Sequence, residues 1–500
     1  MKKKVSKVLN IVLWTVLVLM VFLGILLVQV GKWVPATFGN IPFEEILYHL
    51  MSPLEGTDTS YVSDFIRTCL PAPIVFTVCF LCFVLFIHKN KKKNLEEGTY
   101  SRRKNAFIVC ASSIGCMICC FLGAYNCSAQ IRLDEYLYNL KHPSNIFEQY
   151  YVNPENVTYS FPETKRNLIY IFLESMEQTY EDKEHGGAME ESLIPELQSI
   201  QENNLTFGTN GFIAPSLNGF TAGAMIGETS GIPIKTSVNG NEFIKEDNYL
   251  AGAYSIGDIL AQNGYHNELM IGSDAVFGGR KYYFEQHGNY EIVDYGSAIV
   301  NGWIPSDYRV WWGYEDIKLF DFAKIELEKL SSQNEPFNFT MLTVDTHFTG
   351  GYICDECENI YDDQYSNVLR CSSKQVAEFI AWAQQQPWYE NTTIVLAGDH
   401  NCMDTTWFQD IEASGYVRKE YYTIINSPIA VQQNKTRELC TYDLFPTTLA
   451  SLGVTFDSPR LGFGTNLYLD TPTLVELMGI DTFNSELSKQ SAYYDNYILR

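Results

Sequence analysis

Acidic and imidazole side chains follow three apolar runs of the chain. Glu174 comes directly after LIYIFL. Asp345 and His347 follow FTMLTV, and Asp399 and His400 follow TTIVLAG. An apolar run without alternation is typical of a strand covered on both faces, and parallel strands bring their carboxyl ends to one ligand-binding edge. Turn formation alone explains poorly why acids or imidazoles follow three strands. Carboxylates with one imidazole suit Mn²⁺, Mg²⁺ or Zn²⁺, so we predict metal chemistry at this edge.

The first of these segments also has a simpler interpretation. In NLIYIFLESMEQTY the strand could be followed by the N-terminus of a helix, where the helix dipole favours an acid such as Glu177. On this segment alone the two hypotheses are balanced. The other strand ends favour the metal site.

A nucleophile for such a site is expected within residues 211–233, which are rich in small side chains and contain Thr221. Small residues let a helix N-terminus pack tightly against a sheet, where it can stabilise an alkoxide or a phosphate oxygen. A metal-bound hydroxyl loses its proton more readily, so Thr221 could attack phosphorus near neutral pH. Thr221 could instead be an ordinary N-cap, and Ser216 competes for either role.

The elements that position these residues alternate along the chain. A strand and a helix in turn predict an α/β fold with a mainly parallel sheet and helices on both faces. The expected strands are 168–173, 266–272, 337–344 and 392–397, and the expected helices are 254–263, 314–332 and 374–385. A short amphipathic helix at 43–50 is expected on the outer membrane surface, and 126–165 is expected to be a linker that folds onto the globular domain.

The first 125 residues contain apolar runs long enough to cross a bilayer, at about 9–30, 69–88 and 106–125. A secretory signal peptide would begin similarly, but no small-residue cleavage site follows promptly. Lys and Arg are concentrated at the N-terminus and in the loop 88–104, which the positive-inside rule assigns to the cytoplasm. We therefore predict a multi-pass protein with its large domain, 166–500, on the extracytoplasmic face.

This large domain is acidic. Residues 126–500 hold 52 Asp and Glu against 22 Lys and Arg. Such a charge repels nucleic acid and anionic lipid at long range, so we expect no nucleic-acid partner. An anionic substrate would need a local device such as a metal ion.

The cysteines divide between the membrane runs and the large domain. Cys354 and Cys357 form a CxxC, but no second pair follows at the spacing of a zinc site, so a disulfide between Cys371 and either of them is preferred. Cys402 could be proposed as a metal ligand, although a buried structural cysteine is the commoner case.

Six segments in order carry a resemblance to a known family: IYIFLESMEQTY, GFTAGAMIGETSGIP, FGGRKYYFEQHG, TVDTHFTGGY, LAGDHN, and YDLFPTTLASLGV with RLGFGTNLY. Over most of residues 165–470 the chain resembles the alkaline phosphatase and sulfatase superfamily. Within it the chain looks like the membrane-bound phosphoglycerol transferases, of the phosphoglycerol transferase I type more than the lipoteichoic acid synthases. The resemblance implies an alkaline-phosphatase-like sandwich.

The resemblance also implies a ligand set. In the family the metal, expected here to be Mn²⁺ with Mg²⁺ or Zn²⁺ as alternatives, is held by the acid after the first strand, the nucleophilic threonine and an Asp-His pair. These fall on Glu174, Thr221, Asp399 and His400. Ser175 and Glu177 are then expected to support the start of a helix rather than to bind metal.

The resemblance also implies roles for His347, Arg280 and His287, and for Asp345 beside His347. The histidine near the scissile phosphate falls on His347, with Asp345 beside it. Arg280 and His287 lie in a segment where relatives bind the phosphoglycerol head group. We expect these residues to contact the substrate.

The implied reaction is transfer of phosphoglycerol from phosphatidylglycerol to an extracytoplasmic glycan or polyglycerophosphate (teichoic) acceptor through a covalent Thr221 intermediate, at the bacterial inner membrane. A sulfatase would need a C/S-x-P-x-R motif, which the sequence lacks. A phosphoethanolamine transferase or phosphodiesterase of the same fold stays open, as does an inactive envelope scaffold. The acceptor stays open among glucan, teichoic polymer, glycolipid and water.

Overall fold

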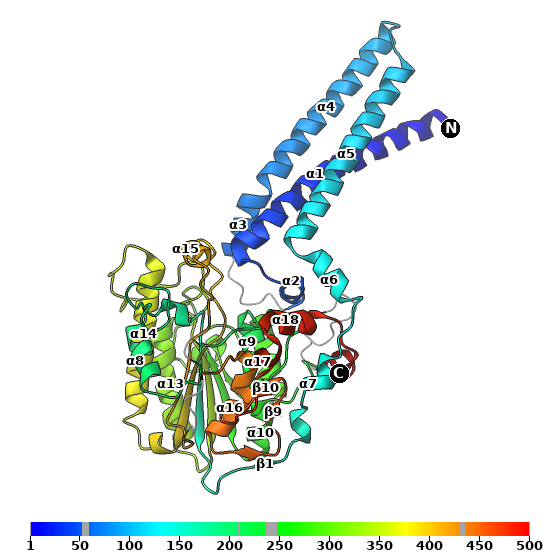
Figure 1. Ribbon diagram of the computed structural model, residues 1–500. Helices are drawn as coiled ribbons and strands as arrows, with labels where there is room; N and C mark the ends of the chain where they lie inside the picture. The colour runs from blue at the N-terminus through cyan, green and yellow to red at the C-terminus, as the bar shows by residue number, and fades with distance from the viewer. Residues whose placement is uncertain (1, 53–59, 209–210, 237–247, 431–435, 500) are drawn as a thin grey trace. The chain divides into compact units, whose positions relative to one another are not determined.

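The computed structural model describes residues 2–52, 60–208, 211–236, 248–430 and 436–499 (Figure 1). The chain divides into two compact units. The first contains Met1–Phe43 and Asp58–Leu137, and the second contains Glu44–Thr57 and Tyr138–Arg500. Each unit is described by itself below.

The first unit is helical. Its helices are α1 (Lys2–Phe38), α3 (Ser60–Cys69), α4 (Pro71–Glu96) and α5 (Arg102–Gln130). Among the described residues, three helical spans are long and apolar enough to cross a membrane: Val8–Phe38, Tyr61–Glu96 and Arg102–Gln130. The apolar runs of the sequence fall inside these spans, and their assignment to a bilayer stays a prediction.

Helices α1 and α5 approach closely at two glycines. A Cβ atom added to Gly123 would lie 2.1 Å from the Gly24 carbonyl oxygen, so no side chain fits there without a shift of the backbone. Trp14 and Leu17 of α1 pack in one small buried cluster with Val84 and Ile87 of α4. Small residues at such contacts are how apolar helices pack when both sides face an equally apolar solvent.

Helix α2 (Phe43–Met51) confirms the amphipathic helix expected at 43–50, and its expected place on the outer membrane surface stays a prediction. Tyr48 is fully buried and belongs to the same core cluster as Phe220 and Tyr249 of the second unit. The buried side of α2 carries Glu44, Glu45 and Tyr48. Its apolar face is not buried, since Ile46 and Leu47 are partly exposed and Leu50 is exposed.

A central sheet organises the second unit. Within the described residues it has six strands in the order β4-β3-β5-β2-β6-β7, all parallel except β7, which pairs antiparallel with β6. The central strand, β2 (Asn167–Leu173), is buried along its whole length, as its unbroken apolar run predicts. The other strands are β3 (His266–Ile271), β4 (Glu291–Val293), β5 (Phe337–Leu342), β6 (Thr392–Gly398) and β7 (Tyr422–Ile425). The predicted mainly parallel sheet is confirmed.

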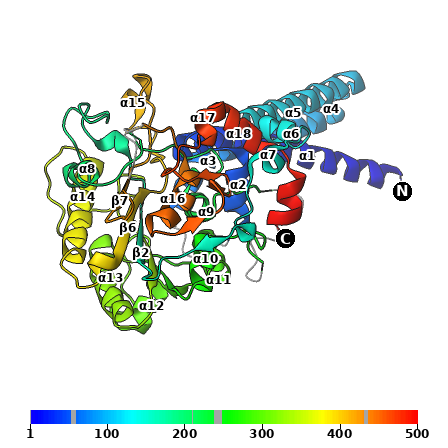
Figure 2. The ribbon, with the colours of Figure 1, turned by 60° about the horizontal axis from the view of Figure 1, so that its bottom comes forward.

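Helices cover both faces of this sheet, as predicted. Figures 1 and 2 show α8, α13 and α14 on one face and α9, α10 and α16 on the other. The larger helices are α8 (Pro195–Glu202), α9 (Thr221–Ser230), α10 (Ile256–Gln262), α11 (Arg280–Gln286), α12 (Tyr295–Val300), α13 (Asp316–Ser331), α14 (Gln364–Ala383), α16 (Leu444–Ser451) and α18 (Ile480–Ser488). Shorter helices are α6 (Leu133–Asn139), α7 (Ile146–Tyr150), α15 (Gln409–Ala413) and α17 (Leu474–Met478).

Local signals explain the helix starts. A capping box between Ser255 and Asp258 begins α10. Helix α14 begins ten residues before the expected 374, because the Asp363 side chain accepts a hydrogen bond from the Ser366 amide and caps it. The first two turns of α14 contain the buried residues Tyr365, Val368 and Leu369 at helical spacing, so the expected helix began too late.

The segment expected as a linker makes several contacts within the second unit. The Ser144 amide donates to the Gln490 carbonyl, and Val152 forms a bridge with Gly462. Strand β1 (Tyr159–Ser160) pairs with β8 (Thr455–Phe456), and β9 (Arg460–Leu461) pairs with β10 (Gly464–Thr465). These contacts hold residues 144–160 against the C-terminal part of the chain.

Candidate active site

The carboxyl ends of β2 and β6 bring two acids together. Leu173 is in register with Gly398, so Glu174 and Asp399 leave the sheet side by side. Ser175 has a φ of 50°, a left-handed conformation that few residues other than glycine adopt. In this turn the Ser175 amide donates to Asp399 Oδ1 at 2.8 Å and its hydroxyl donates to Glu174 Oε1 at 2.7 Å. Ser175 therefore fixes both carboxylates rather than beginning a helix.

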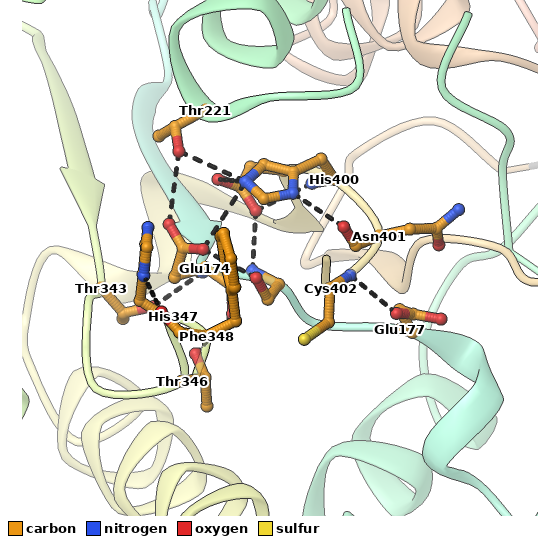
Figure 3. A network of polar contacts seen from close by, with 12 residues as sticks. Glu174, Glu177, Thr221, Thr343, Thr346, His347, Phe348, His400, Asn401 and Cys402 are labelled. Atoms are coloured by element: carbon orange, nitrogen blue, oxygen red, sulfur yellow. Dashed lines mark hydrogen bonds and ion pairs between the residues drawn. The ribbon is translucent and has the colours of Figure 1, made fainter. Parts of the chain in front are cut away.

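Three buried side chains form a group that could hold a metal ion: Glu174, Asp399 and His400 (Figure 3). His400 Nε2 lies 3.6 Å from Glu174 Oε1 and 3.5 Å from Asp399 Oδ2. The opposite ring nitrogen, Nδ1, donates to the Asn401 carbonyl at 2.9 Å. This hydrogen bond orients the ring and presents Nε2 to the carboxylates, as in many metal-binding histidines.

Thr221 joins this group. Its hydroxyl lies 3.4 Å from Glu174 Oε2 and 3.3 Å from His400 Nε2 (Figure 3). Thr221 is the first residue of α9 and Phe220 occupies the N-cap position, so the N-cap hypothesis for Thr221 is wrong. For Ser216, the structure gives a bond from its amide to the Asn484 side chain. Of the two candidate hydroxyls, the structure brings that of Thr221 to the acids.

The electrostatics of the group call for a cation. Burial and the Glu174 carboxylate raise the pKa of Asp399 to about 7. Burial alone would lower the pKa of His400, but Asp399 and Glu174 outweigh it and raise that pKa to about 9. Within the described residues, Asp399 Oδ2 is buried and has no hydrogen-bond partner. An uncompensated carboxylate oxygen is costly to bury, so these donors fit a divalent ion.

His347 lies on the loop after β5. Its Nδ1 donates to the Phe348 carbonyl at 2.6 Å, and its ring lies 5.0 Å from the ring of Trp312 and 5.9 Å from that of Trp311. The same loop is tied to the metal group, because the Glu174 amide donates to the Thr343 hydroxyl at 2.9 Å. The loops after β2 and β5 thus form one hydrogen-bonded assembly (Figure 3).

Asp345 has a structural partner. Its Oδ2 accepts from the Asp316 amide at 3.2 Å, while Asp316 Oδ2 accepts from the Asp345 amide at 2.9 Å. Burial raises the pKa of both carboxyls. The charge of Asp316 adds to the rise for Asp345, and the charges of Glu174 and Glu315 add to the rise for Asp316. This reciprocal pair connects the start of α13 to the loop that carries His347. The expected contact of Asp345 with substrate stays a prediction.

The two head-group candidates lie in different places. Arg280, at the start of α11, is buried and donates to the Phe277 carbonyl at 3.0 Å and the Asp274 carbonyl at 2.8 Å. Burial lowers its pKa to about 10, and the charge of Glu174 opposes this shift, so Arg280 lies within electrostatic range of the metal group. His287 is instead buried, with Nε2 2.8 Å from the Tyr249 carbonyl and Nδ1 3.6 Å from Asp258 Oδ2. These contacts hold the His287 ring within the protein, and its expected contact with substrate stays a prediction.

Glu177 is correctly excluded from the metal group but does not begin an α-helix. A short 3-10 turn, Gln178–Tyr180, follows it. Glu177 Oε1 accepts from the Cys402 amide at 2.9 Å, and Oε2 accepts from Arg418 Nε at 3.0 Å. Burial raises the pKa of the Cys402 thiol to about 12, which matches a buried structural cysteine rather than a thiolate ligand.

The cysteine pair near this loop is also defined. Cys357 and Cys371 form a disulfide, one of the two pairings expected. Cys354 is buried, and its Sγ lies 3.5 Å from that of Cys357 and 3.9 Å from that of Cys371. The disulfide connects the segment after His347 to α14.

Sequence reasoning missed several residues near the site. Trp311 and Trp312 flank His347, and their only sequence signal is a tryptophan pair in a polar stretch. His49 of α2 lies 5.3 Å, between ring centroids, from Phe220, the residue before Thr221. No local pattern could have placed α2 there, because 171 positions separate the two residues in the chain.

Comparisons with known proteins agree with this geometry. Residues 166–454, more than half of the chain, match the sulfatase family. Phosphoglycerol transferase I of Escherichia coli O127:H6 is 30% identical over 314 residues, which cover 61% of this chain and 39% of that protein. The protein of the same name from Escherichia fergusonii is 29% identical over the same shares of the two chains. The matched part therefore spans well under half the length of these relatives.

A solved structure gives the same fold. A protein in the alkaline phosphatase superfamily from Vibrio parahaemolyticus aligns with a TM-score of 0.50 and 19% identity, over 63% of this chain and 72% of that one. The expected alkaline-phosphatase-like fold is thus confirmed. With its parallel sheet, its acid and histidine group at the carboxyl edge and the match over residues 166–454, this chain belongs to the sulfatase family.

Proposed function

We propose that the protein transfers phosphoglycerol from phosphatidylglycerol to a hydroxyl of an extracytoplasmic glycan or teichoic-type acceptor, through a covalent intermediate on Thr221. The observation that carries this proposal is the position of the Thr221 hydroxyl, 3.4 Å from Glu174 and 3.3 Å from His400 at a group suited to a divalent ion. The 30% identity to phosphoglycerol transferase I supports the choice of head group.

The residues that would hold the ion are Glu174, Thr221, Asp399 and His400, with Mn²⁺ first and Mg²⁺ or Zn²⁺ as alternatives. When bound, such an ion lowers the pKa of a coordinated hydroxyl and offsets negative charge on phosphate oxygens. The chain's own residues prepare the site for it. Ser175 orients both carboxylates, and the Asn401 carbonyl orients His400.

In the first step Thr221 Oγ1 forms a bond to phosphorus, and the bond from phosphorus to the diacylglycerol oxygen breaks. The proton leaves the Thr221 hydroxyl, and a proton reaches the diacylglycerol oxygen. In the second step an acceptor hydroxyl attacks the same phosphorus atom, and Thr221 leaves and regains a proton. The N-terminus of α9 adds partial positive charge beside the attacking oxygen.

His347 is suited to the protons of this reaction. The bond from its Nδ1 to the Phe348 carbonyl fixes the orientation of the ring, and Trp311 and Trp312 pack around it. We assign His347 to stabilise the phosphate or to protonate an oxygen that leaves it. Arg280 adds positive charge on the side of Glu174.

A lipid donor explains the apolar helices. Among the described residues, the three candidate spans would hold the protein in the bilayer that contains phosphatidylglycerol, with the second unit outside the cytoplasm by the positive-inside rule. An acidic enzyme repels anionic ligands at long range. A donor that arrives by diffusion within the membrane avoids this barrier.

The test is intact mass spectrometry of the full chain in detergent after incubation with Mn²⁺ and a short-chain phosphatidylglycerol. We expect a gain of one glycerophosphoryl group, mapped to Thr221, with release of diacylglycerol. Thr221→Ala should show neither, and the matched control Ser216→Ala should behave as wild type. Diacylglycerol release without an adduct would indicate hydrolysis, and no reaction at all would exclude this donor.

A further inference from the structure

Helix α2 is an unexpected part of the catalytic unit. In the sequence it lies between the first two apolar spans, yet Glu44–Thr57 belong to the second unit. Tyr48 is fully buried there, and its hydroxyl lies 2.5 Å from that of Tyr249 and donates to the Gly278 carbonyl. Gly278 is two residues before Arg280. Through Tyr48, α2 is anchored to the segment that positions Arg280.

The same helix rests on the residue before the nucleophile. The Phe220 ring lies 4.9 Å from the ring of Tyr48 and 5.3 Å from that of His49. Phe220 is the N-cap residue of α9, whose first residue is Thr221. Helix α2 therefore packs at the end of α9 that presents the attacking hydroxyl.

Two polar side chains of α2 face this region. Glu45 is buried, and His49 Nε2 lies 3.9 Å from Glu45 Oε1. Burial raises the pKa of the Glu45 carboxyl, and the His49 and His400 imidazoles oppose this rise, so Glu45 is within electrostatic range of both. The His49 side chain is 43% exposed, against 2% for Glu45. One member of the pair is thus open to a ligand and the other holds it in place.

We infer that α2 forms a wall of the active site and that His49, oriented by Glu45, binds a hydroxyl of the donor's glycerol group. This inference rests on the proposed function. A glycerol hydroxyl can donate or accept a hydrogen bond, and the exposed His49 imidazole offers either role, while the buried Glu45 carboxyl orients the ring. The Glu174 and Asp399 carboxylates belong to the metal group, and the positively charged Arg280 side chain can only donate hydrogen bonds. The polar pair of α2 fills this chemical role beside Thr221.

The test compares two small ligands on the full chain in detergent with Mn²⁺. Glycerol phosphate carries the two free hydroxyls, and ethyl phosphate lacks them. By isothermal titration we expect the wild type to bind glycerol phosphate about tenfold more tightly, the effect of one hydrogen bond to a charged group. Glu45→Gln and His49→Ala should bring this ratio close to one and leave the Kd for ethyl phosphate within about twofold of wild type.

The control is His142→Ala, which removes an exposed histidine of the same unit and should keep the wild-type ratio. If Glu45→Gln and His49→Ala keep the preference for glycerol phosphate, α2 does not bind the glycerol group, although the proposed function stands. If both ligands weaken equally in both variants, the pair has only a structural role and the inference fails. If the wild type shows no preference for glycerol phosphate over ethyl phosphate, the glycerol donor itself is wrong and both proposals fall.

Discussion

Arg418 and Glu177 form an ion pair inside the protein. Arg418 Nε lies 3.0 Å from Glu177 Oε2, and the Glu177 side chain is fully buried. Because Glu177 also accepts from the Cys402 amide, the pair ties the loop after β2 to the loop after β6, which carries His400. The proposed metal ligands on these two loops therefore rest on one buried charge pair.

Removing one partner of this ion pair should lower the stability of the fold, because the other charge is then buried without an opposite charge beside it. We expect Glu177→Ala to lower the free energy of unfolding by about 3 to 5 kcal/mol. Thermal or denaturant unfolding of the full chain measures this change. The control is Glu190→Ala, whose pair with Lys183 is exposed and should contribute less than about 1 kcal/mol. Equal effects of the two substitutions would contradict the structural role of Glu177.

Asp399→Asn tests the metal group directly. The substitution removes a carboxylate that faces Glu174 and His400, so we expect the affinity for Mn²⁺ to fall by at least about 100-fold. Isothermal titration of the metal-free full chain measures this affinity. Asp410→Asn, on the surface of α15, should bind Mn²⁺ as the wild type does. Unchanged affinity in Asp399→Asn would mean that the ion binds elsewhere.

The glycine contact between α1 and α5 offers a matched pair of substitutions. An added Cβ at Gly123 would overlap the Gly24 carbonyl, whereas one at Gly115 of the same helix meets no atom within 4 Å. We expect Gly123→Ala to destabilise the first unit by about 1 to 3 kcal/mol, the usual cost of overpacking. Gly115→Ala should be neutral. Thermal unfolding in detergent compares the two, and equal stability would argue against this helix contact.

The disulfide should stabilise the loop after His347. Its two cysteines are 14 residues apart, and closing a loop of this length contributes about 3 kcal/mol. We therefore expect Cys357→Ser to lower the free energy of unfolding by about this amount in an oxidising buffer. Cys354→Ser should have a much smaller effect. A larger loss of stability in Cys354→Ser than in Cys357→Ser would show that Cys354 is the partner of Cys371.

Glu268 should make stability depend on pH. Burial, with Glu326 as a further cause, raises the pKa of Glu268 to about 8 from 4.5, and within the described residues neither carboxylate oxygen has a hydrogen-bond partner. Because the folded form holds the Glu268 proton more tightly than the unfolded form, protonated Glu268 contributes to the free energy of unfolding. This contribution is complete below pH 4.5 and is lost as the pH rises through 8. The loss is roughly 5 kcal/mol at most. Denaturant unfolding between pH 5 and pH 9 should show a flatter profile for Glu268→Gln than for wild type.

The strands and their catalytic ends could be predicted from the sequence because they are local patterns. The apolar run 168–173 is unbroken, and Glu174 follows it directly, so strand and ligand position come from one signal. The pairing of β2 with β6 then follows from a parallel sheet, in which strand ends meet at one edge. Thr221 needed the family resemblance, because a hydroxyl among small residues has no distinctive spacing.

Other features depend on contacts between distant segments. Three of them require a partner that no local pattern reveals. They are the left-handed turn at Ser175, the hydrogen bond from the Asp345 amide to Asp316, and the burial of His287 against Tyr249. Helix α2 is the clearest example. Its periodicity is visible, but Tyr48 finds its hydroxyl partner 201 residues later in the chain.

The place of α2 has a consequence for proteolytic release. A protease that cut the chain between Leu137 and Tyr138 would free a polypeptide containing the whole sheet and every predicted metal ligand. That fragment would lack Tyr48, and the pocket left around Tyr249 and Phe220 would open to water. A released form of the protein would therefore differ from the full chain beside Thr221, the proposed nucleophile.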